Sequence, residues 1–151
     1  MTEFANEGIR RLWAASALKL WPGRYWIVGF TPGQRQDALD LAGAAGEGYV
    51  SLIADHHEVS VILHNDIWKT AGQQLQPRQV FGPLCGLTFD VPLDIEVAGY
   101  LAPAVSALAA AGISIVPQCA LIHDHLFVAE HDFDAACDVL ATLRTRAQSA
   151  A

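Results

Sequence analysis

Two histidines flank an acid near the end of the stretch AGISIVPQCALIHDHLFVAEHDF, where His123, Asp124 and His125 follow one another. They come directly after a run from Val97 to Ile122 that carries no charged side chain. A carboxylate in such surroundings can pair with the ammonium group or the side-chain cation of a small ligand, and partial burial strengthens that pair. The alternative is a turn aspartate that hydrogen-bonds to its own backbone.

The two histidines lie two positions apart, so in a β-strand they would share a face, as two ligands of one metal ion could. The chain has neither an H-E-x-x-H motif nor a cysteine pair at zinc-binding spacing. We therefore expect no metal and no cofactor. His123 and His125 are then polar hairpin residues, or groups that adjust ligand binding around neutral pH. The other four histidines are His56, His57, His64 and His131.

Motifs for catalysis are missing from the chain, which contains no G-x-S-x-G, no P-loop and no G-x-G-x-x-G. Cys119 precedes His123 closely enough to suggest a nucleophile and its base. Within IVPQCALI, however, a cysteine is expected to be a small buried apolar residue. We therefore expect no enzymatic activity.

Composition excludes several classes of partner. At 52% hydrophobic and 17% charged residues the 151-residue chain is globular, not disordered. A net charge of −7 with nine Lys and Arg argues against nucleic acid and against an anionic membrane surface. Three cysteines without a C-x-x-C pair indicate reduced thiols in a cytoplasmic protein, and MTEFANEGIRR has acids where a signal peptide would be apolar.

The uncharged run from Val97 to Ile122 is long enough to span a bilayer. It is interrupted by Pro103, Gly112 and Pro117, and its two halves have different hydrophobic periods. We therefore expect a soluble protein without a membrane span.

The first half of the chain predicts a helix, a strand, a second helix and a hairpin from its hydrophobic periods and turn residues. Pro22 and Gly23 end the first helix, and Gly46 and Gly48 end the second. The predicted elements are a helix over 6–20, a strand over 24–30, a helix over 35–45, a hairpin of strands over 49–55 and 58–64, and a linker over 65–79.

The second half repeats this order with a strand over 84–90, a helix that begins near Leu101, a hairpin of strands over 113–122 and 126–130, and a last helix from about Asp132 to Arg146. Pro103 is tolerated only in the first turn of its helix. The inward face of that helix is predicted to contain Ala98, Leu101, Ala102, Val105, Leu108, Ala109 and Gly112. Its other face, with Ala104, Ala107 and Ala111, has no charge, so we expect a partner against it.

Strand, helix, strand, strand occurs twice, which predicts an α+β fold of two split βαβ halves, each an antiparallel sheet with helices on one face. The boundary is expected in the linker, between an N-terminal domain at 1–76 and a C-terminal domain at 77–151. The two halves suggest an old duplication.

The second half resembles the small tandem ACT-domain proteins related to the CASTOR arginine sensors, whose pattern reads approximately E-G-P-L-D-F, G-x-L-A, A-G-I-S-I-F and S-T-x-x-T-D-Y. In the first half, GYVSLIADHHEVSVIL is similar to that family's G-F-x-S-L-T-R-T-x-D-E-L-S-V-V. The matching residues are Asp90, Pro92, Leu93 and Asp94, then Gly99, Leu101 and Ala102, then Gly112 to Ile115, then Asp124, and in the first half Glu58, Ser60 and Val61.

This resemblance implies two tandem ferredoxin-like ACT domains of βαββαβ type, a homodimer, and a non-enzymatic sensor that binds a small amino-acid-like ligand at the interface between its ACT domains. It also implies which residues bind the ligand. They are Asp124, Gly99, Tyr100, Glu58, Ser60 and Val61, together with Cys119, His123 and His125, which replace the family's Ser, Thr and Tyr at these positions.

Each implied contact has an alternative that needs no ligand. Backbone N–H groups at Gly99 and Tyr100 could bind a carboxylate at the start of a helix, or the glycine could simply allow close packing. Glu58, Ser60 and Val61 could offer a strand edge to a zwitterion, or pair within the sheet. For the whole protein the alternative is a homodimeric interaction or assembly module with a vestigial ligand site.

Overall fold

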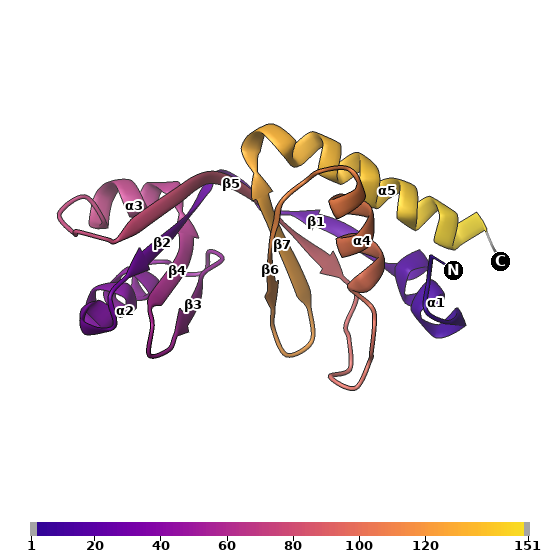
Figure 1. The fold of residues 1–151 in the computed structure, drawn as a ribbon, viewed down its shortest axis with the longest axis horizontal. Coiled ribbons are helices and arrows are strands. Elements are labelled where there is room, and N and C mark those ends of the chain that lie inside the picture. The colour runs from indigo at the N-terminus through magenta and orange to yellow at the C-terminus, as the bar shows by residue number, and fades with distance from the viewer. Residues whose placement is uncertain (1–2, 150–151) are drawn as a thin grey trace. The chain divides into compact units, whose positions relative to one another are not determined.

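The computed structural model describes residues 3–149, and the chain forms two compact units (Figure 1). One consists of Met1–Leu20 and Gly86–Ala151 and is called the split unit here; the other, Trp21–Cys85, is the continuous unit. The boundary differs from the one expected between residues 76 and 77. The first twenty residues fold with the second half of the chain, because both of their elements pair with elements of that half.

In the continuous unit an antiparallel sheet of order β3-β4-β2-β5 is packed against helices. Val28, Phe30, Val59, Val61 and Leu63 form the core with α2, because alternate residues of β2 and β4 point to that side. The elements are β2 (Tyr25–Phe30), the short helix η1 (Pro32–Gln34), α2 (Arg35–Gly43), β3 (Ser51–Ala54), β4 (Val59–His64), α3 (Asn65–Ala71) and the first residues of β5 (Gln79–Asp90).

The strands and the helix predicted for this region are confirmed, but the predicted linker over 65–79 is wrong in its first half. Residues Asn65–Ala71 form α3. The His64 ring accepts a hydrogen bond from the Asp66 N–H and caps the helix, while Ile67 and Trp68 pack against the core. The polar composition of this segment did not predict a helix. The helix is stabilised by the packing of Ile67 and Trp68 against the core, which the local sequence does not show.

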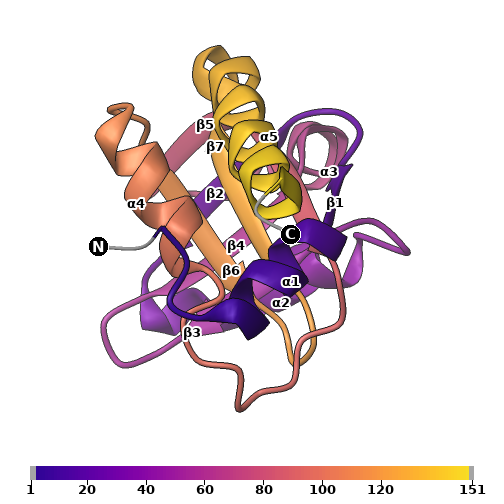
Figure 2. The same cartoon turned by 90° about the vertical axis from the view of Figure 1, so that its right-hand side faces the viewer.

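In the split unit the sheet order is β1-β5-β7-β6, and helices α4 and α5 cover one face of β6 and β7 (Figure 2). The core is built on fully buried Trp13, Phe89, Leu108, Leu126 and Leu140. The elements are α1 (Glu7–Ala15), β1 (Ala17–Leu20), the last residues of β5, α4 (Ala102–Ala110), β6 (Ile115–Cys119), β7 (Asp124–Ala129), η2 (Glu130–Asp132) and α5 (Phe133–Ser149).

The N-terminal helix is shorter than predicted. Asn6 caps it by accepting a hydrogen bond from the Ile9 N–H at 3.0 Å, and it ends at Ala15 instead of Leu20. Residues Ala17–Leu20 form β1, which pairs antiparallel with β5 from Ala17 opposite Asp90 to Leu20 opposite Leu87. Pairing along the edge of a sheet has overridden the helical period at these residues.

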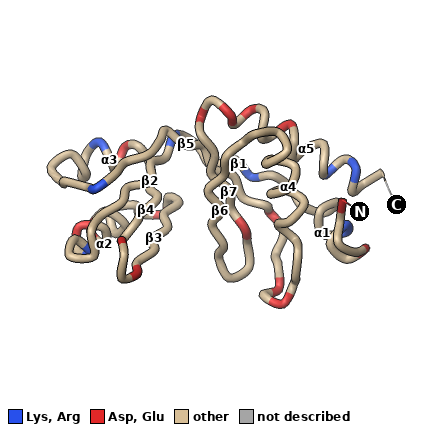
Figure 3. The backbone as a smooth tube through the Cα atoms, viewed as in Figure 1, with Lys and Arg blue, Asp and Glu red and all other residues tan. Residues whose placement is uncertain are grey.

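Helix α4 begins with Pro103 in its first turn, as predicted, but its buried face coincides only in part with the predicted inward face. Ala104 and Leu108 are completely buried, whereas Val105, predicted to face inward, is 40% exposed. Because no residue of α4 is charged, the sequence gives an apolar pattern without a direction (Figure 3). Ala104, from the face for which we expected an outside partner, therefore lies in the core of its own unit, whereas Ala111 of the same face is exposed.

The long uncharged run is divided between α4, which has nine residues, and β6. Within residues 3–149, no helix is long and apolar enough to cross a membrane.

Candidate functional site

A pocket of about 300 Å³ lies in the split unit, and we name it the Asp124 pocket. Three segments meet there: the loop after β5, the residues that lead into α4, and the turn between β6 and β7. Five of the residues singled out from the sequence line it, namely Gly99, Tyr100, Cys119, His123 and Asp124.

Gly99 gives this pocket its turn into α4. Its φ is +87°, a left-handed value that strains any residue with a Cβ atom. An added Cβ would meet only Ala5, at 3.7 Å, so the requirement is conformational. The first N–H groups of a helix have no partner within the helix and carry partial positive charge. This end of the pocket therefore favours an anionic group.

Tyr100 is held in place by the N-terminal segment of the chain. The Trp13 indole donates a hydrogen bond to the Tyr100 carbonyl at 2.8 Å, and the Ser16 hydroxyl lies 2.6 Å from the Tyr100 hydroxyl. The Trp13 and Tyr100 rings are stacked with centroids 5.5 Å apart. Burial raises the pKa of Tyr100 to about 12. The hydrogen bond with Ser16 lowers this pKa, and the charge of Asp124 raises it further. The phenol is thus a neutral core group, and only its backbone can serve a ligand.

Trp13 and Ser16 were not singled out from the sequence. Both residues lie within the helix predicted over 6–20, whose pattern does not distinguish them from their neighbours. Recognising them as supports of the pocket requires the contact between α1 and residue 100, which are distant in sequence. No local pattern records that contact.

Asp124 and Cys119 face each other across the β6–β7 pair, where they are directly opposed. The thiol donates a hydrogen bond to the Asp124 carboxylate, and this bond, burial and the carboxylate charge together raise the pKa of Cys119 to about 11. A thiol held protonated in this way is a poor nucleophile. The expectation that Cys119 is buried is wrong as well, because the residue is exposed.

The two histidines beside Asp124 serve different partners. His125 is half-buried, and its Nδ1 lies 2.8 Å from the Thr88 hydroxyl. Burial lowers the pKa of His125, with a further contribution from the charge of His123 and an opposing one from Asp124. His123 lines the pocket, with its Nε2 3.9 Å from a carboxylate oxygen of Asp90. Residues 3–149 hold no cluster of three or more His, Cys, Asp or Glu side chains suited to a metal.

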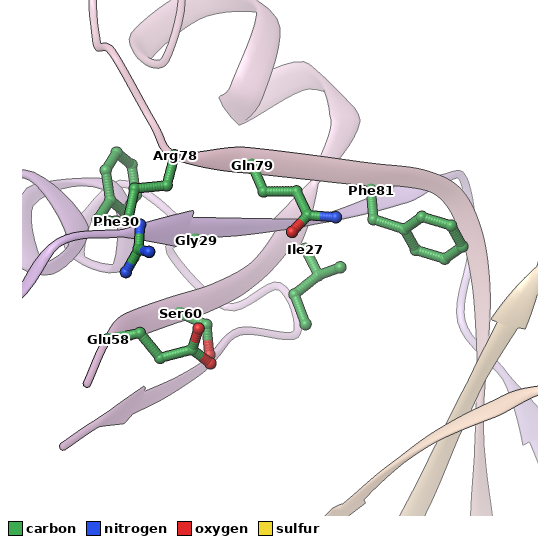
Figure 4. A pocket seen from close by; sticks show the side chains of 8 residues that line it. All are labelled: Ile27, Gly29, Phe30, Glu58, Ser60, Arg78, Gln79 and Phe81. Carbon is green, nitrogen blue, oxygen red and sulfur yellow. The ribbon is translucent and has the colours of Figure 1, made fainter. Parts of the chain in front are cut away.

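The candidates from the first half of the chain lie in the continuous unit. Val61 is fully buried in the core, and its strand β4 is hydrogen-bonded to β3 on one side and to β2 on the other. Strand β4 therefore has no free edge, and the expectation that Glu58, Ser60 and Val61 offer a strand edge to a ligand is wrong. Glu58 and Ser60 line a second pocket, of about 420 Å³, together with Arg78, Gln79 and others (Figure 4).

Comparison with known proteins gives the fold. No protein-family model matches the chain, and no curated protein does. Among solved structures it is similar to the protein Atu0741 from Agrobacterium tumefaciens, with 24% identity and a TM-score of 0.65 over 85% of this chain and 89% of that one. It is also similar to VC0802 from Vibrio cholerae, described as a possible transport protein, with 22% identity and a TM-score of 0.64 over 88% and 94%.

A third similar structure is the regulatory subunit of aspartate kinase from Thermus flavus, with 12% identity and a TM-score of 0.60 over 85% of this chain and 95% of that one. Matches of this extent include residues of both units. The predicted fold class is therefore confirmed: the chain is an α+β protein with the tandem ACT fold of such regulatory subunits.

Proposed function

We propose that this protein is a non-enzymatic, CASTOR-like ACT sensor that binds a small amino-acid-like ligand in the Asp124 pocket. The observation that carries the proposal is that an acidic side chain and the N-terminal end of a helix line the same 300 Å³ space. A ligand with a cationic and an anionic group finds a complement for each there. The similar solved structures, which include aspartokinase III from Escherichia coli in complex with aspartate and ADP, support an amino-acid ligand.

Two polar features of the pocket bind the ligand in this proposal. Asp124 accepts hydrogen bonds from the ligand's ammonium or side-chain cation. The N–H groups between Gly99 and the first turn of α4 bind its carboxylate, and Trp13 and Ser16 hold that segment through Tyr100. A ligand can transmit a signal only through different affinities for two arrangements of the protein.

A thermal-denaturation screen against the twenty amino acids and their common analogues tests the proposal. A ligand at about 100 times its Kd stabilises the native state by about 2.7 kcal/mol, which is readily measured as a rise in Tm. The rise should saturate, and it should disappear in Asp124→Asn. The matched control is Asp138→Asn, which removes the same charge from the exposed side of α5. A hit that survives Asp124→Asn contradicts this site.

A second function, homodimeric assembly, is favoured by apolar side chains around the same pocket. Leu121 is 73% exposed, Ile122 is 50% exposed and Ile95 is 77% exposed. Light scattering of the double variant Leu121→Glu, Ile122→Glu tests it, because a dimer built on this surface would become a monomer. Ala104→Glu is unsuitable for this purpose, because Ala104 is in the core.

A further inference from the structure

Three large apolar side chains are exposed where the loop after β5 meets the turn between β6 and β7. Ile95 belongs to the loop, Leu121 and Ile122 belong to the turn, and all three are at least half exposed. The Leu93 N–H donates a hydrogen bond to the Ile122 carbonyl at 2.8 Å, so the loop and the turn lie side by side. Exposed apolar side chains that gather in this way mark a surface that another molecule covers.

Hydrogen bonds hold the backbone around Ile95 in a defined turn. The Asp94 carboxylate accepts a hydrogen bond from the Glu96 N–H at 3.0 Å. The Asp94 carbonyl accepts another from the Val97 N–H, also at 3.0 Å. A partner that covers Ile95 therefore meets a backbone that is already ordered, which reduces the entropy lost on binding.

The charged residues of this surface are all acidic. Asp90, Asp94 and Glu96 of the loop are exposed, and Figure 3 shows acidic and no basic residues along it. Between Arg78 and Arg144 the chain contains no Lys or Arg at all. The surface around Ile95 therefore has a negative rim without an interspersed positive charge.

The rim has little compensation from within the part of the chain that the structure describes. Residues 3–149 contain no salt bridge from Asp94 or Glu96. Asp90 has one contact of this kind, at 3.9 Å from the Nε2 atom of His123. We name the three acids and the three exposed apolar residues together the Ile95 patch.

A second copy of the chain does not complement the Ile95 patch. In a two-fold dimer the same surface meets itself, so acids of one copy would face acids of the other. The arginines of α1 and α5 are already engaged within their own chain. Arg10 and Arg11 form salt bridges with Glu7. Arg146 forms one with Glu3. The complement of the patch therefore comes from a different protein.

We propose that the Ile95 patch is the docking site of a partner protein that presents a basic amphipathic helix. The apolar face of that helix packs on Ile95, Leu121 and Ile122. Lysines and arginines beside this face pair with Asp94 and Glu96, which selects the partner and speeds its approach. An anionic membrane or a nucleic acid has the wrong sign of charge. The proposal requires no amino acid in the Asp124 pocket.

Fluorescence anisotropy of a labelled model peptide, titrated with the intact chain, tests the proposal. The peptide consists of leucine and lysine, ordered so that all leucines lie on one face of a helix. We expect saturable binding that weakens as salt is added, because the charge pairs are exposed. A peptide with glutamate in place of lysine, and one with the leucines and lysines scrambled, should each bind at least about tenfold more weakly. Absence of binding, or equal binding of the scrambled peptide, overturns the proposal.

A charge variant locates the binding on the rim. Asp94→Asn with Glu96→Gln removes two charges, and the asparagine oxygen can still accept the hydrogen bond from the N–H of residue 96. This double variant should bind the leucine–lysine peptide at least about tenfold more weakly. Asp134→Asn with Asp138→Asn removes two charges from exposed positions of α5 and should bind as the unaltered chain does. Equal affinity of the two double variants overturns the site.

An apolar variant locates the binding on the centre of the patch. Leu121→Ser with Ile122→Ser removes two exposed side chains and leaves the core intact. It should also weaken peptide binding at least about tenfold. The matched control is Leu39→Ser with Ile53→Ser, two exposed apolar residues of the continuous unit, which should leave the affinity unchanged. Unaltered affinity in the Leu121 and Ile122 variant contradicts the site.

The same measurements separate the patch from the Asp124 pocket and from self-association. Peptide binding that persists in Asp124→Asn supports the docking site, whether or not the thermal screen finds a ligand. Binding that is lost in Asp124→Asn but kept in the Asp94 and Glu96 variant places a peptide lysine in the pocket and overturns the patch. A dimer of the unaltered chain that Leu121→Ser with Ile122→Ser converts to a monomer, measured by light scattering, assigns the surface to a second copy and overturns it too.

Discussion

At the scale of single residues, the acid between two histidines now has a physical explanation. Asp124 and its neighbour His125 point to opposite faces of β7, as consecutive residues of a strand must. The acid therefore meets Cys119 and the pocket, while His125 meets Thr88. Their proximity in sequence therefore reflects one strand with two different surroundings.

The hydrogen bond between Cys119 and Asp124 predicts a slow thiol. Because the carboxylate holds the pKa of Cys119 near 11, little thiolate is present at pH 8.5 although the residue is exposed. Asp124→Asn removes the charge and should speed the alkylation of Cys119 by iodoacetamide about tenfold or more. Mass spectrometry of the labelled peptides measures this, with Asp138→Asn as the control. Unchanged labelling in Asp124→Asn would mean that the carboxylate does not control the thiol.

His125 predicts a pH dependence of stability. Its pKa is lowered in the folded chain, so between the folded value and the ordinary 6.5 the unfolded chain binds more protons. The contribution of neutral His125 to the free energy of unfolding is thus complete above pH 6.5, and it is lost as the pH falls through the pKa of His125 in the folded chain. Urea unfolding at pH 7.5 and pH 5.5 should show a smaller decrease in His125→Gln than in the unaltered chain. His56→Gln, at an exposed turn, should leave the decrease unchanged; a similar decrease in His125→Gln and the unaltered chain contradicts the prediction.

At the scale of elements, α1 supports the candidate site through one side chain. Trp13→Phe keeps an aromatic ring in the core but removes the donor to the Tyr100 carbonyl. Leaving that carbonyl without its partner should lower the free energy of unfolding by about 1–3 kcal/mol. If α1 also positions the pocket, Trp13→Phe should weaken the binding of the ligand found in the thermal screen more than Leu12→Ala does. Leu12 makes no hydrogen bond to the Tyr100 carbonyl, so it serves as the control. Equal weakening by both would limit Trp13 to a packing role.

The orientation of α4 is testable with two adjacent residues. Ala104→Glu introduces a charge at a fully buried position and should destabilise the split unit by at least about 3 kcal/mol. Val105→Glu changes a residue that is 40% exposed and should cost less than about 1 kcal/mol. Denaturant unfolding of both variants measures the difference. A larger destabilisation by Val105→Glu than by Ala104→Glu would mean that α4 turns Val105 to the core, as the sequence pattern predicts.

At the scale of the whole molecule, the chain leaves one unit and returns to it. Residues 1–20 supply α1 and the strand β1 to a unit whose other elements begin after residue 85. A chain truncated to begin at residue 21 should therefore lose the cooperative unfolding of the split unit, because it loses Trp13 from the core. A contiguous domain at 77–151 would instead survive the truncation. Hydrogen exchange of α5 distinguishes these outcomes: fast exchange is expected.

The two pockets also belong to separate units, and each has its own source of charge complementarity. The Asp124 pocket combines two acids, Asp94 and Asp124, with the N-terminal end of a helix. The pocket beside Gly29 combines an acid, Glu58, with a guanidinium, Arg78.

The sequence by itself determined the fold class and most of the elements. Hydrophobic periods and turn residues reflect interactions within a few residues, so they specified β2, α2, the two hairpins and α5. The resemblance to the tandem ACT-domain proteins implied the five site residues that line the Asp124 pocket. The hydrophobic periods failed at residues 16–20 and at α4, where the local pattern allowed two solutions.

Only the tertiary structure decided which solution was used. Pairing with β5 converted the end of a predicted helix into β1, and packing in the core selected the face with Ala104 and Leu108 on a helix that has no charged residue. The same holds for the contact of Trp13 with residue 100 and for the position of Glu58 and Arg78 in the lining of one pocket. These features join residues far apart in the chain, and their energies arise only when the fold brings them together.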